Sequence, residues 1–153
     1  MSSDLMEYFN KGSRLGILST SSTDGRVDSA VFGSPNMIDE KTVLVATAKN
    51  RTFTNLLENP NAVYIIVERC SESPNETNTN METGSSVMDW KGIRVYMKMK
   101  EYSTSGEMLE MIRSQAANFV GEEAAKMIYA SMTFEIYEVR PLVDFGQGWE
   151  KSI

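Results

Sequence analysis

The chain has 153 residues, of which 41% are hydrophobic and 24% are charged, the balance of an ordinary soluble globular protein. Its formal net charge of -6 at pH 7 argues against non-specific nucleic-acid binding, because neutralising phosphates requires a basic surface. The sequence has no histidine and one cysteine, Cys70, so the usual ligands of zinc, haem and iron–sulfur clusters are missing. We therefore expect no such metal site, whereas a magnesium or calcium site built from carboxylates stays open.

The length and the absence of a long apolar run predict one cytoplasmic domain. A chain of this size can bury roughly 70% of its unfolded surface, which is enough for a core without disulfides. We expect a single domain over residues 1–153, with a polar loop at 71–90 and an irregular tail at 141–153. No apolar run approaches the ~20 residues that cross a bilayer. The N-terminus also lacks the basic start and apolar segment of a signal peptide.

The first half of the chain predicts one helix and then closely spaced strands. Apolar residues at helical spacing predict a helix over residues 2–11, with Gly12 as its stop signal. A second, short helix is expected at about 52–58, ending before Pro60 because the residue before a proline disfavours helical geometry. Short apolar or β-branched runs, the first two joined by the turn signal STDG, predict four strands at residues 14–20, 26–35, 43–48 and 62–69.

The second half of the chain predicts two further strands, with a helical segment inserted between them. Residues 92–102 alternate apolar and polar, which predicts a fifth strand. A capping-box pattern from Thr104 to Glu107 predicts the start of a helix with one apolar face, which is also a candidate dimer contact. Residues 132–141 predict the sixth strand.

The apolar face of that sixth strand switches near Ile136 and Tyr137, which indicates a bulge. Together the elements predict a mainly β fold, a six-stranded antiparallel β-barrel with peripheral helices.

A doubly basic turn lies between the third predicted strand and the short helix. Lys49 and Arg51 flank the first helical turn, where free N–H groups and the helix dipole favour an anion. Thr52 adds a hydroxyl donor, and Asn55 follows one turn later. Arginine can bind a phosphate through two parallel N–H bonds. This pattern indicates a phosphate site, and the alternative is a solvated turn whose cations offset nearby acidic residues.

The order of these segments resembles the pyridoxamine 5'-phosphate oxidase-like family, the FMN-binding split β-barrels. The resemblance covers roughly residues 5 to 145 and is nearest to the small flavin-binding members. Its sharpest piece is KNRTFTNLLENP at 49–60, which in such proteins binds the FMN phosphate and begins the short helix. The segment KGIRV at 91–95 is the second piece. The resemblance implies the fold already predicted and FMN as the cofactor.

The resemblance also implies roles for individual residues. Arg51 and Thr52 match the positions that bind the FMN phosphate, with Lys49 close by and Asn55 one turn along. Thr47 and Ala48 match the strand end that offers backbone groups to the flavin. Ser29 and Ala30 match the strand against which the flavin ring lies.

Members of this family usually form homodimers with each flavin held between two subunits. Residues of a partner chain, such as Trp90, Lys91 or Trp149, are therefore candidates to complete the site. Relatives that use a deazaflavin coenzyme carry a more basic cleft, so the resemblance favours FMN. Haem-degrading relatives use a histidine ligand and the oxidase itself uses an arginine and histidine pattern near its C-terminus. This chain has no histidine, so neither haem degradation nor vitamin B6 oxidation is expected.

The resemblance therefore implies an FMN-dependent oxidoreductase that passes electrons from a reduced nucleotide or similar donor to a small substrate, with no catalytic side chain assigned. The alternative is a non-enzymatic FMN carrier or redox-sensing module with the same fold and ligand. A third hypothesis is an interaction barrel without a cofactor.

Overall fold

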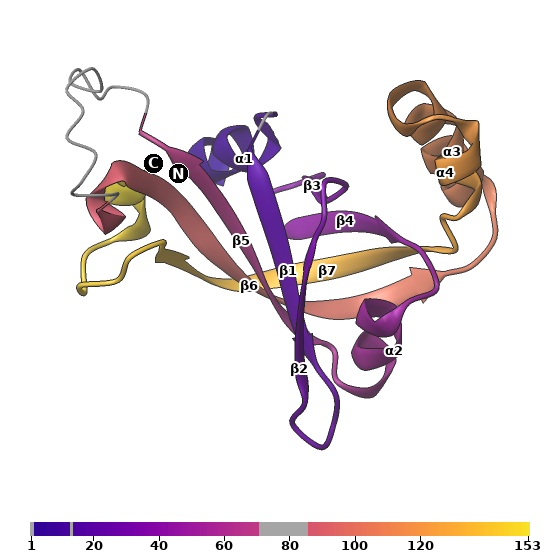
Figure 1. Cartoon of the computed structure of the whole chain (residues 1–153), viewed down its shortest axis with the longest axis horizontal. Coiled ribbons are helices and arrows are strands. Elements are labelled where there is room, and N and C mark those ends of the chain that lie inside the picture. Colours follow the sequence, from indigo (N-terminus) through magenta and orange to yellow (C-terminus); the bar gives the residue numbers. More distant parts are fainter. Residues whose placement is uncertain (1, 13, 71–85) are drawn as a thin grey trace.

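The computed structural model describes residues 2–12, 14–70 and 86–153. Seven strands form one antiparallel sheet in the order β2-β1-β5-β6-β7-β4-β3. The sheet is strongly curled, as Figure 1 shows. It encloses a core of buried hydrophobic residues. The strands are β1 (Leu15–Ser21), β2 (Val27–Val31), β3 (Asn36–Met37), β4 (Thr42–Thr47), β5 (Asn61–Arg69), β6 (Trp90–Ser103) and β7 (Ala130–Pro141).

In the described ranges, four α-helices lie at the periphery of this sheet. They are α1 (Ser2–Asn10), α2 (Arg51–Glu58), α3 (Glu107–Val120) and α4 (Glu122–Lys126). Helices α3 and α4 lie side by side at the end of the long β6–β7 ribbon, away from α1 and α2 (Figure 1). The predicted mainly β architecture with peripheral helices is thus confirmed.

The sheet has seven strands where the sequence predicted six. The additional strand is β3, which pairs through Asn36 and Met37 with Leu44 and Val43 of β4. It escaped prediction because it has two residues, directly follows Pro35, and shows no alternation of its own.

Most of the loop expected at 71–90 lies outside the described residues. At its end, Val87–Asp89 form a 3-10 helix and Trp90 already belongs to β6. In the tail that follows Pro141, Trp149–Ser152 form one further 3-10 turn.

The bulge predicted in the last strand is confirmed. Tyr96 of β6 pairs with Glu138, whereas the next residue, Met97, pairs with Ile136, so Tyr137 is the extra residue. Ile136 is consequently buried while Tyr137 is 57% exposed. The inserted residue explains why the apolar face appears to change sides in the sequence.

Helix α3 does not begin with the predicted capping box. Its N-cap is Gly106, which has a positive φ of 111° and makes no side-chain cap. Strand β6 continues to Ser103, and a turn follows in which the Ser103 hydroxyl donates to the Ser105 carbonyl. Since this turn occupies the residues around Thr104, the helix begins only at Glu107.

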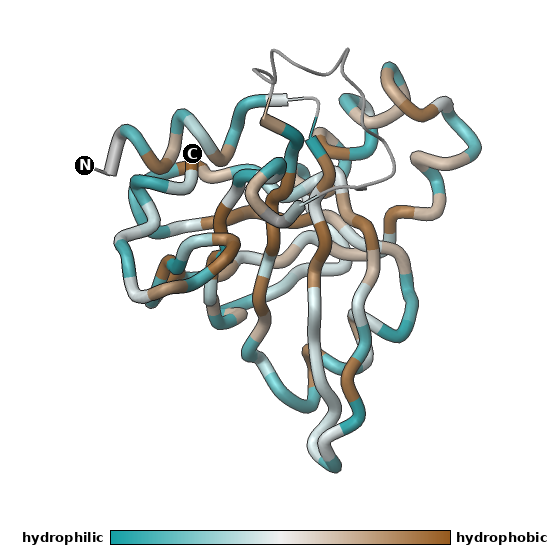
Figure 2. The backbone as a smooth tube through the Cα atoms, turned by 60° about the vertical axis from the view of Figure 1, so that its left-hand side comes forward, coloured by the Kyte–Doolittle hydropathy of each residue, from teal (hydrophilic) through white to brown (hydrophobic). Residues whose placement is uncertain are grey.

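The apolar core lies inside the curled sheet. The two edge strands of the sheet, β2 and β3, are joined by a connection that contains Ser34. Alternate residues of β1, β4, β5 and β6 are buried, including Leu18, Val45 and Val95, which are fully covered. Figure 2 shows the hydrophobic residues gathered along the central strands. The Ser34 hydroxyl donates to the Ala46 carbonyl at 2.9 Å and accepts from the Ala46 amide at 3.2 Å. The connection after β2 is thereby fastened to β4.

A buried polar cluster fixes α1 to the sheet. The Tyr8 hydroxyl donates to Glu68 at 2.6 Å, and Arg14 lies 3.4 Å from the same carboxylate oxygen. The Arg14 side chain is only 4% exposed and also donates to the carbonyl groups at the end of α1. Burial raises the pKa of Glu68, but the hydrogen bond from Tyr8 and the charges of Lys91, Arg14 and Lys11 outweigh it and lower that pKa.

Replacing Glu68 with glutamine is expected to reduce stability by about 1–2 kcal/mol at pH 7, because a charged hydrogen-bond acceptor is lost. The folded protein lowers the pKa of Glu68, so this contribution is present above the ordinary carboxyl pKa and is lost as pH falls through the lowered value. Thermal unfolding of both proteins from pH 7 downward measures the difference. A difference in Tm that persists unchanged in strong acid would contradict this account.

Candidate functional site

The basic turn after β4 is a well-capped helix start. Asn50 is the N-cap of α2, and its side chain accepts a hydrogen bond from the Phe53 amide at 3.0 Å. The apolar spacing of the helix buries Phe53 and Leu56 against the barrel and leaves Arg51 exposed. The Asn50 cap satisfies one of the amides of the first turn, and the exposed Arg51 is the first residue of the helix.

Two of the predicted site residues point into the protein. Thr52 is 2% exposed, and its hydroxyl donates to Asp28 of β2 at 3.4 Å. Asn55 is 6% exposed, and its amide donates to the Thr20 hydroxyl of β1 at 3.1 Å. These side chains therefore tie α2 to the first hairpin. Asn55 also borders the hollow described next.

A hollow of about 320 Å³, the basic hollow, lies between α2 and the tip of the β1–β2 hairpin. It brings Arg51 together with Arg26, a residue that the sequence analysis did not assign to the site. Glu58 faces the same hollow and accepts hydrogen bonds from the amide and hydroxyl of Thr23, both at 3.0 Å. The hollow is lined by Ser22, Arg26, Val27, Arg51, Thr54, Asn55 and Glu58.

A second hollow of about 650 Å³, the apolar hollow, lies between the barrel and the α3–α4 pair. Its lining is mostly aliphatic or aromatic, and the polar side chains in it are short or neutral. The residues on the barrel side are Ala30, Val31, Phe32, Gly33, Ser34, Ala46, Thr47, Ala48 and Asn50. The residues on the helical side are Ile112, Gln115, Ala116, Phe119, Val120, Ala124 and Ile128.

The structure brings three predicted residues into the apolar hollow and separates two others from it. Ala30, Thr47 and Ala48 line it. Ser29 points to the other face of β2, where its hydroxyl lies 2.9 Å from that of Ser19. The Lys49 ammonium lies over the Tyr129 ring, 5.3 Å from the centroid. Side-chain alternation along β2 explains why Ser29 and Ala30 do not share a face.

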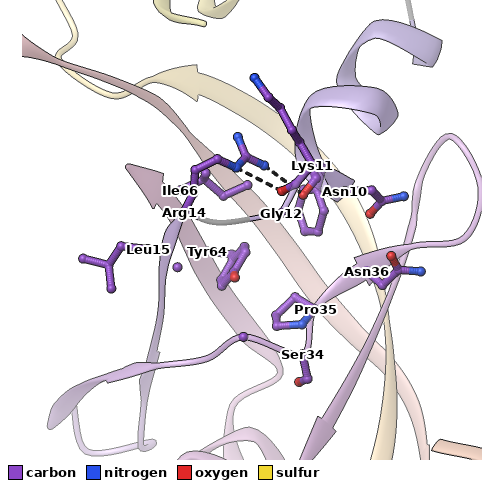
Figure 3. A pocket seen from close by; sticks show the side chains of 13 residues that line it. Asn10, Lys11, Gly12, Arg14, Leu15, Ser34, Pro35, Asn36, Tyr64 and Ile66 are labelled. Atoms are coloured by element: carbon purple, nitrogen blue, oxygen red, sulfur yellow. Dashed lines mark hydrogen bonds between the residues drawn. The ribbon is translucent and has the colours of Figure 1, made fainter. Parts of the chain in front are cut away.

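A third hollow, of about 230 Å³, lies between α1, β1 and the connection after β2 (Figure 3). Several of its polar side chains are engaged in holding the barrel together. The Asn10 side chain donates to the Met37 carbonyl and accepts from the Met37 amide. The Tyr64 hydroxyl donates to the Phe32 carbonyl at 2.8 Å. Burial raises the pKa of Tyr64 to about 12. We therefore assign this hollow a structural role.

The aromatic residues considered as partner contributions lie elsewhere. Trp90 and Lys91 line a hollow with Leu142 and Phe145 near the C-terminus, and Trp149 packs against the core.

Neither a metal cluster nor a membrane span occurs in the described part of the chain. Within residues 2–12, 14–70 and 86–153, no three Cys, Asp or Glu side chains are grouped to hold a metal ion. None of the helices in these ranges is long and apolar enough to cross a membrane.

Several solved structures share the architecture. An FMN-binding protein from Syntrophomonas wolfei subsp. wolfei has a TM-score of 0.68 at 22% identity, covering 94% of this chain and 89% of that one. HutZ, the heme storage protein from Vibrio cholerae, has a TM-score of 0.58 at 16% identity and covers 96% of both chains. A candidate pyridoxamine 5'-phosphate oxidase from Lactobacillus delbrueckii has a TM-score of 0.51 at 12% identity, covering 83% of this chain and 84% of that one.

No protein-family model and no curated protein sequence matches the chain. At identities this low, the likeness to solved structures establishes the arrangement of the backbone. The chain therefore has the split-barrel fold of the pyridoxamine 5'-phosphate oxidase-like proteins.

Proposed function

We propose that this protein binds FMN and acts as a flavin-dependent oxidoreductase on a small substrate. The observation that carries the proposal is that β2 borders two complementary hollows. Arg26 and Arg51 line one of them, and the other is apolar and more than large enough for a fused ring. A flavin mononucleotide has the matching pair of ends, a phosphoryl group and a flat aromatic ring.

The chemistry of the residues fits such a ligand. Arg26 and Arg51 would hold the phosphoryl group, since guanidinium groups bind phosphate oxygens bidentately. Thr47 and Ala48 would offer backbone groups at the end of β4, and Ala30 would leave room for the ring against β2. Lys49, exposed beside Tyr129, would add positive charge to the turn before α2. When bound, FMN supplies hydride and electron transfer, and the protein supplies binding and orientation.

A direct titration tests the proposal. Purified protein freed of ligand is titrated with FMN, with riboflavin as the matched ligand that lacks the phosphoryl group. We expect FMN to bind at least tenfold more tightly, because charge-assisted phosphate contacts contribute about 1.5–3 kcal/mol. Failure to bind FMN would overturn the proposal. Hemin belongs in the same series because one structurally similar protein is described as a heme storage protein.

The same sample separates an enzyme from a carrier. Steady oxidation of a reduced pyridine nucleotide by the FMN-loaded protein, in the presence of an acceptor, would support the oxidoreductase. Binding of FMN without turnover with any donor would instead support the alternative, a non-enzymatic FMN carrier or redox-sensing module. Both proposals place the protein in the cytoplasm, where reduced nucleotides are available.

We also propose that two copies of the chain associate through the surface that carries these hollows. Large apolar side chains are exposed on β2 and at the end of α3: Val27 is 80%, Val31 70% and Phe119 86% exposed. Exposed apolar residues gathered in this way mark interaction surfaces. A second copy would cover them and enclose the flavin.

Light scattering is expected to give twice the chain mass of 17.1 kDa. The variant Phe119→Glu should weaken association about tenfold or more, since central aromatic residues dominate interface energies. Phe145→Glu is the matched control, because Phe145 is 75% exposed and lies in the C-terminal tail. A wild-type mass of one chain at micromolar concentration would contradict the dimer.

A further inference from the structure

The two arginines that line the basic hollow come from different parts of the fold. Arg51 begins α2, whereas Arg26 ends the turn that joins β1 to β2. We call this turn, residues 22–26, the hairpin tip; it projects from the end of the β1–β2 pair (Figure 1). A phosphoryl group can contact both guanidinium groups only where the hairpin tip and α2 keep a suitable separation.

The hairpin tip is held together by its own hydrogen bonds. The Ser22 amide donates to the Arg26 carbonyl at 3.0 Å, and the Ser22 hydroxyl accepts from the Arg26 amide at 3.2 Å. The Gly25 amide donates to the Ser22 carbonyl at 3.1 Å. In addition, Nε of Arg26 lies 3.4 Å from Oδ2 of Asp24, in an ion pair within the tip. The backbone of Arg26 therefore moves with the hairpin tip as one body.

Glu58 joins this tip to α2. Its Oε1 accepts hydrogen bonds from the amide and the hydroxyl of Thr23, each at 3.0 Å. Within the described ranges, no other hydrogen bond or ion pair connects residues 22–26 with α2. The two other side-chain hydrogen bonds from α2 to this hairpin reach its strands and not its tip. Glu58 is therefore the side chain that sets the position of the hairpin tip relative to α2.

We propose that Glu58 is a positioning residue of the basic hollow. Through Thr23 it holds the hairpin tip where Arg26 and Arg51 can bind the same phosphoryl group. The inference rests on the proposed FMN binding and adds a residue that supports its phosphoryl contacts. The carboxylate itself repels a phosphoryl group, so it favours binding only through the groups that it places. Supporting hydrogen bonds of this kind fix the side chains that contact a ligand.

The test is a double-mutant cycle between Glu58 and Arg26. Wild-type protein, Glu58→Ala, Arg26→Ala and the double variant are each titrated with FMN and with riboflavin. The quantity measured is the ratio of the riboflavin Kd to the FMN Kd, which reports on the phosphoryl contacts and is insensitive to a fraction of unfolded sample. Glu58→Gln is the conservative variant, since its amide oxygen still accepts from Thr23. Glu40→Ala is the control, because this exposed carboxylate lies between β3 and β4.

Glu58→Ala is expected to lower this ratio about threefold to tenfold, because binding must then order the hairpin tip as well as the ligand. The riboflavin Kd should hardly change. In the Arg26→Ala background, Glu58→Ala should have no further effect, since the arginine that it positions is absent. Glu58→Gln should keep the wild-type ratio or raise it, because the acceptor stays and the repulsion is removed.

The role of Glu58 alone would be overturned by a ratio in Glu58→Ala at or above the wild-type value, by the same fall in the Arg26→Ala background, or by an equal fall in Glu40→Ala. An equal loss of affinity for both ligands in Glu58→Ala would also overturn it, because the carboxylate would then support the barrel and not the phosphoryl contacts. Failure of the wild-type protein to bind FMN would overturn the flavin proposal and this inference with it.

Discussion

Replacing Gly92 with alanine is expected to lower the free energy of unfolding by about 2–5 kcal/mol, through steric overlap and backbone strain. Gly92 has a φ of +152°, and a Cβ atom built there would lie 1.8 Å from the Ile66 carbonyl oxygen. The backbones of β5 and β6 pair at this point, so the overlap cannot be relieved by a side-chain rotation. The segment KGIRV therefore needs its glycine for packing.

The corresponding fall in Tm is roughly 5–15 °C for a chain of this size. Thermal unfolding followed by circular dichroism measures it. Gly12→Ala is the matched control, because a Cβ atom at Gly12 meets no atom within 4 Å. If both variants melt at the wild-type temperature, the close approach of β5 to Gly92 is wrong.

Replacing Arg51 with alanine is expected to weaken FMN binding by about 1–3 kcal/mol, or roughly 5-fold to 150-fold in Kd. The physical reason is the loss of a charge-assisted pair between the guanidinium and the phosphoryl group. Arg26→Ala should act in the same direction, since Arg26 lines the same basic hollow. Flavin fluorescence during titration gives the dissociation constants.

Riboflavin serves as the internal control for both arginine variants. It lacks the phosphoryl group, so its affinity should hardly change in either. Arg69→Ala is the control variant, because this arginine lies over the Trp90 ring at a different end of the sheet, 5.2 Å from the centroid. Unchanged FMN affinity in Arg51→Ala, or an equal loss for riboflavin, would place the phosphoryl group elsewhere.

The elements that the sequence predicted well are those with a strong repeating pattern. Strand β6 follows from the alternation of Ile93, Val95 and Met97, all of which are buried. The end of helix α2 follows from Pro60, because the residue before a proline disfavours helical geometry. Short elements carry too few residues to show a period, which is why the two residues of β3 were missed. The capping pattern at Thr104 failed because a local turn competes for the same residues.

Most of the residues that the sequence suggested for the site are neighbours along the chain, and their contacts with a ligand stay predictions. The charge and spacing of the basic turn suggested Arg51, and the family resemblance added Thr47 and Ala48 at the end of β4. Arg26 was missed since its relation to Arg51 depends on how the β1–β2 hairpin folds over α2. The available signal was the alternation that places Arg26 on the same face as Ala30. Likewise, the inward direction of Thr52 and Asn55 depends on which face of α2 the barrel covers.

The bonds that fasten α2 to the first hairpin have an entropic consequence. Thr52 contacts Asp28, Asn55 contacts Thr20, and Glu58 contacts Thr23, so three contacts spaced about one turn apart fix the helix to the hairpin. Association then needs little further ordering of the backbone, and the freedom that is lost belongs mainly to the incoming molecule and to the two guanidinium side chains. The FMN site that we propose would thus be formed before the cofactor arrives, and few direct contacts would suffice for firm binding.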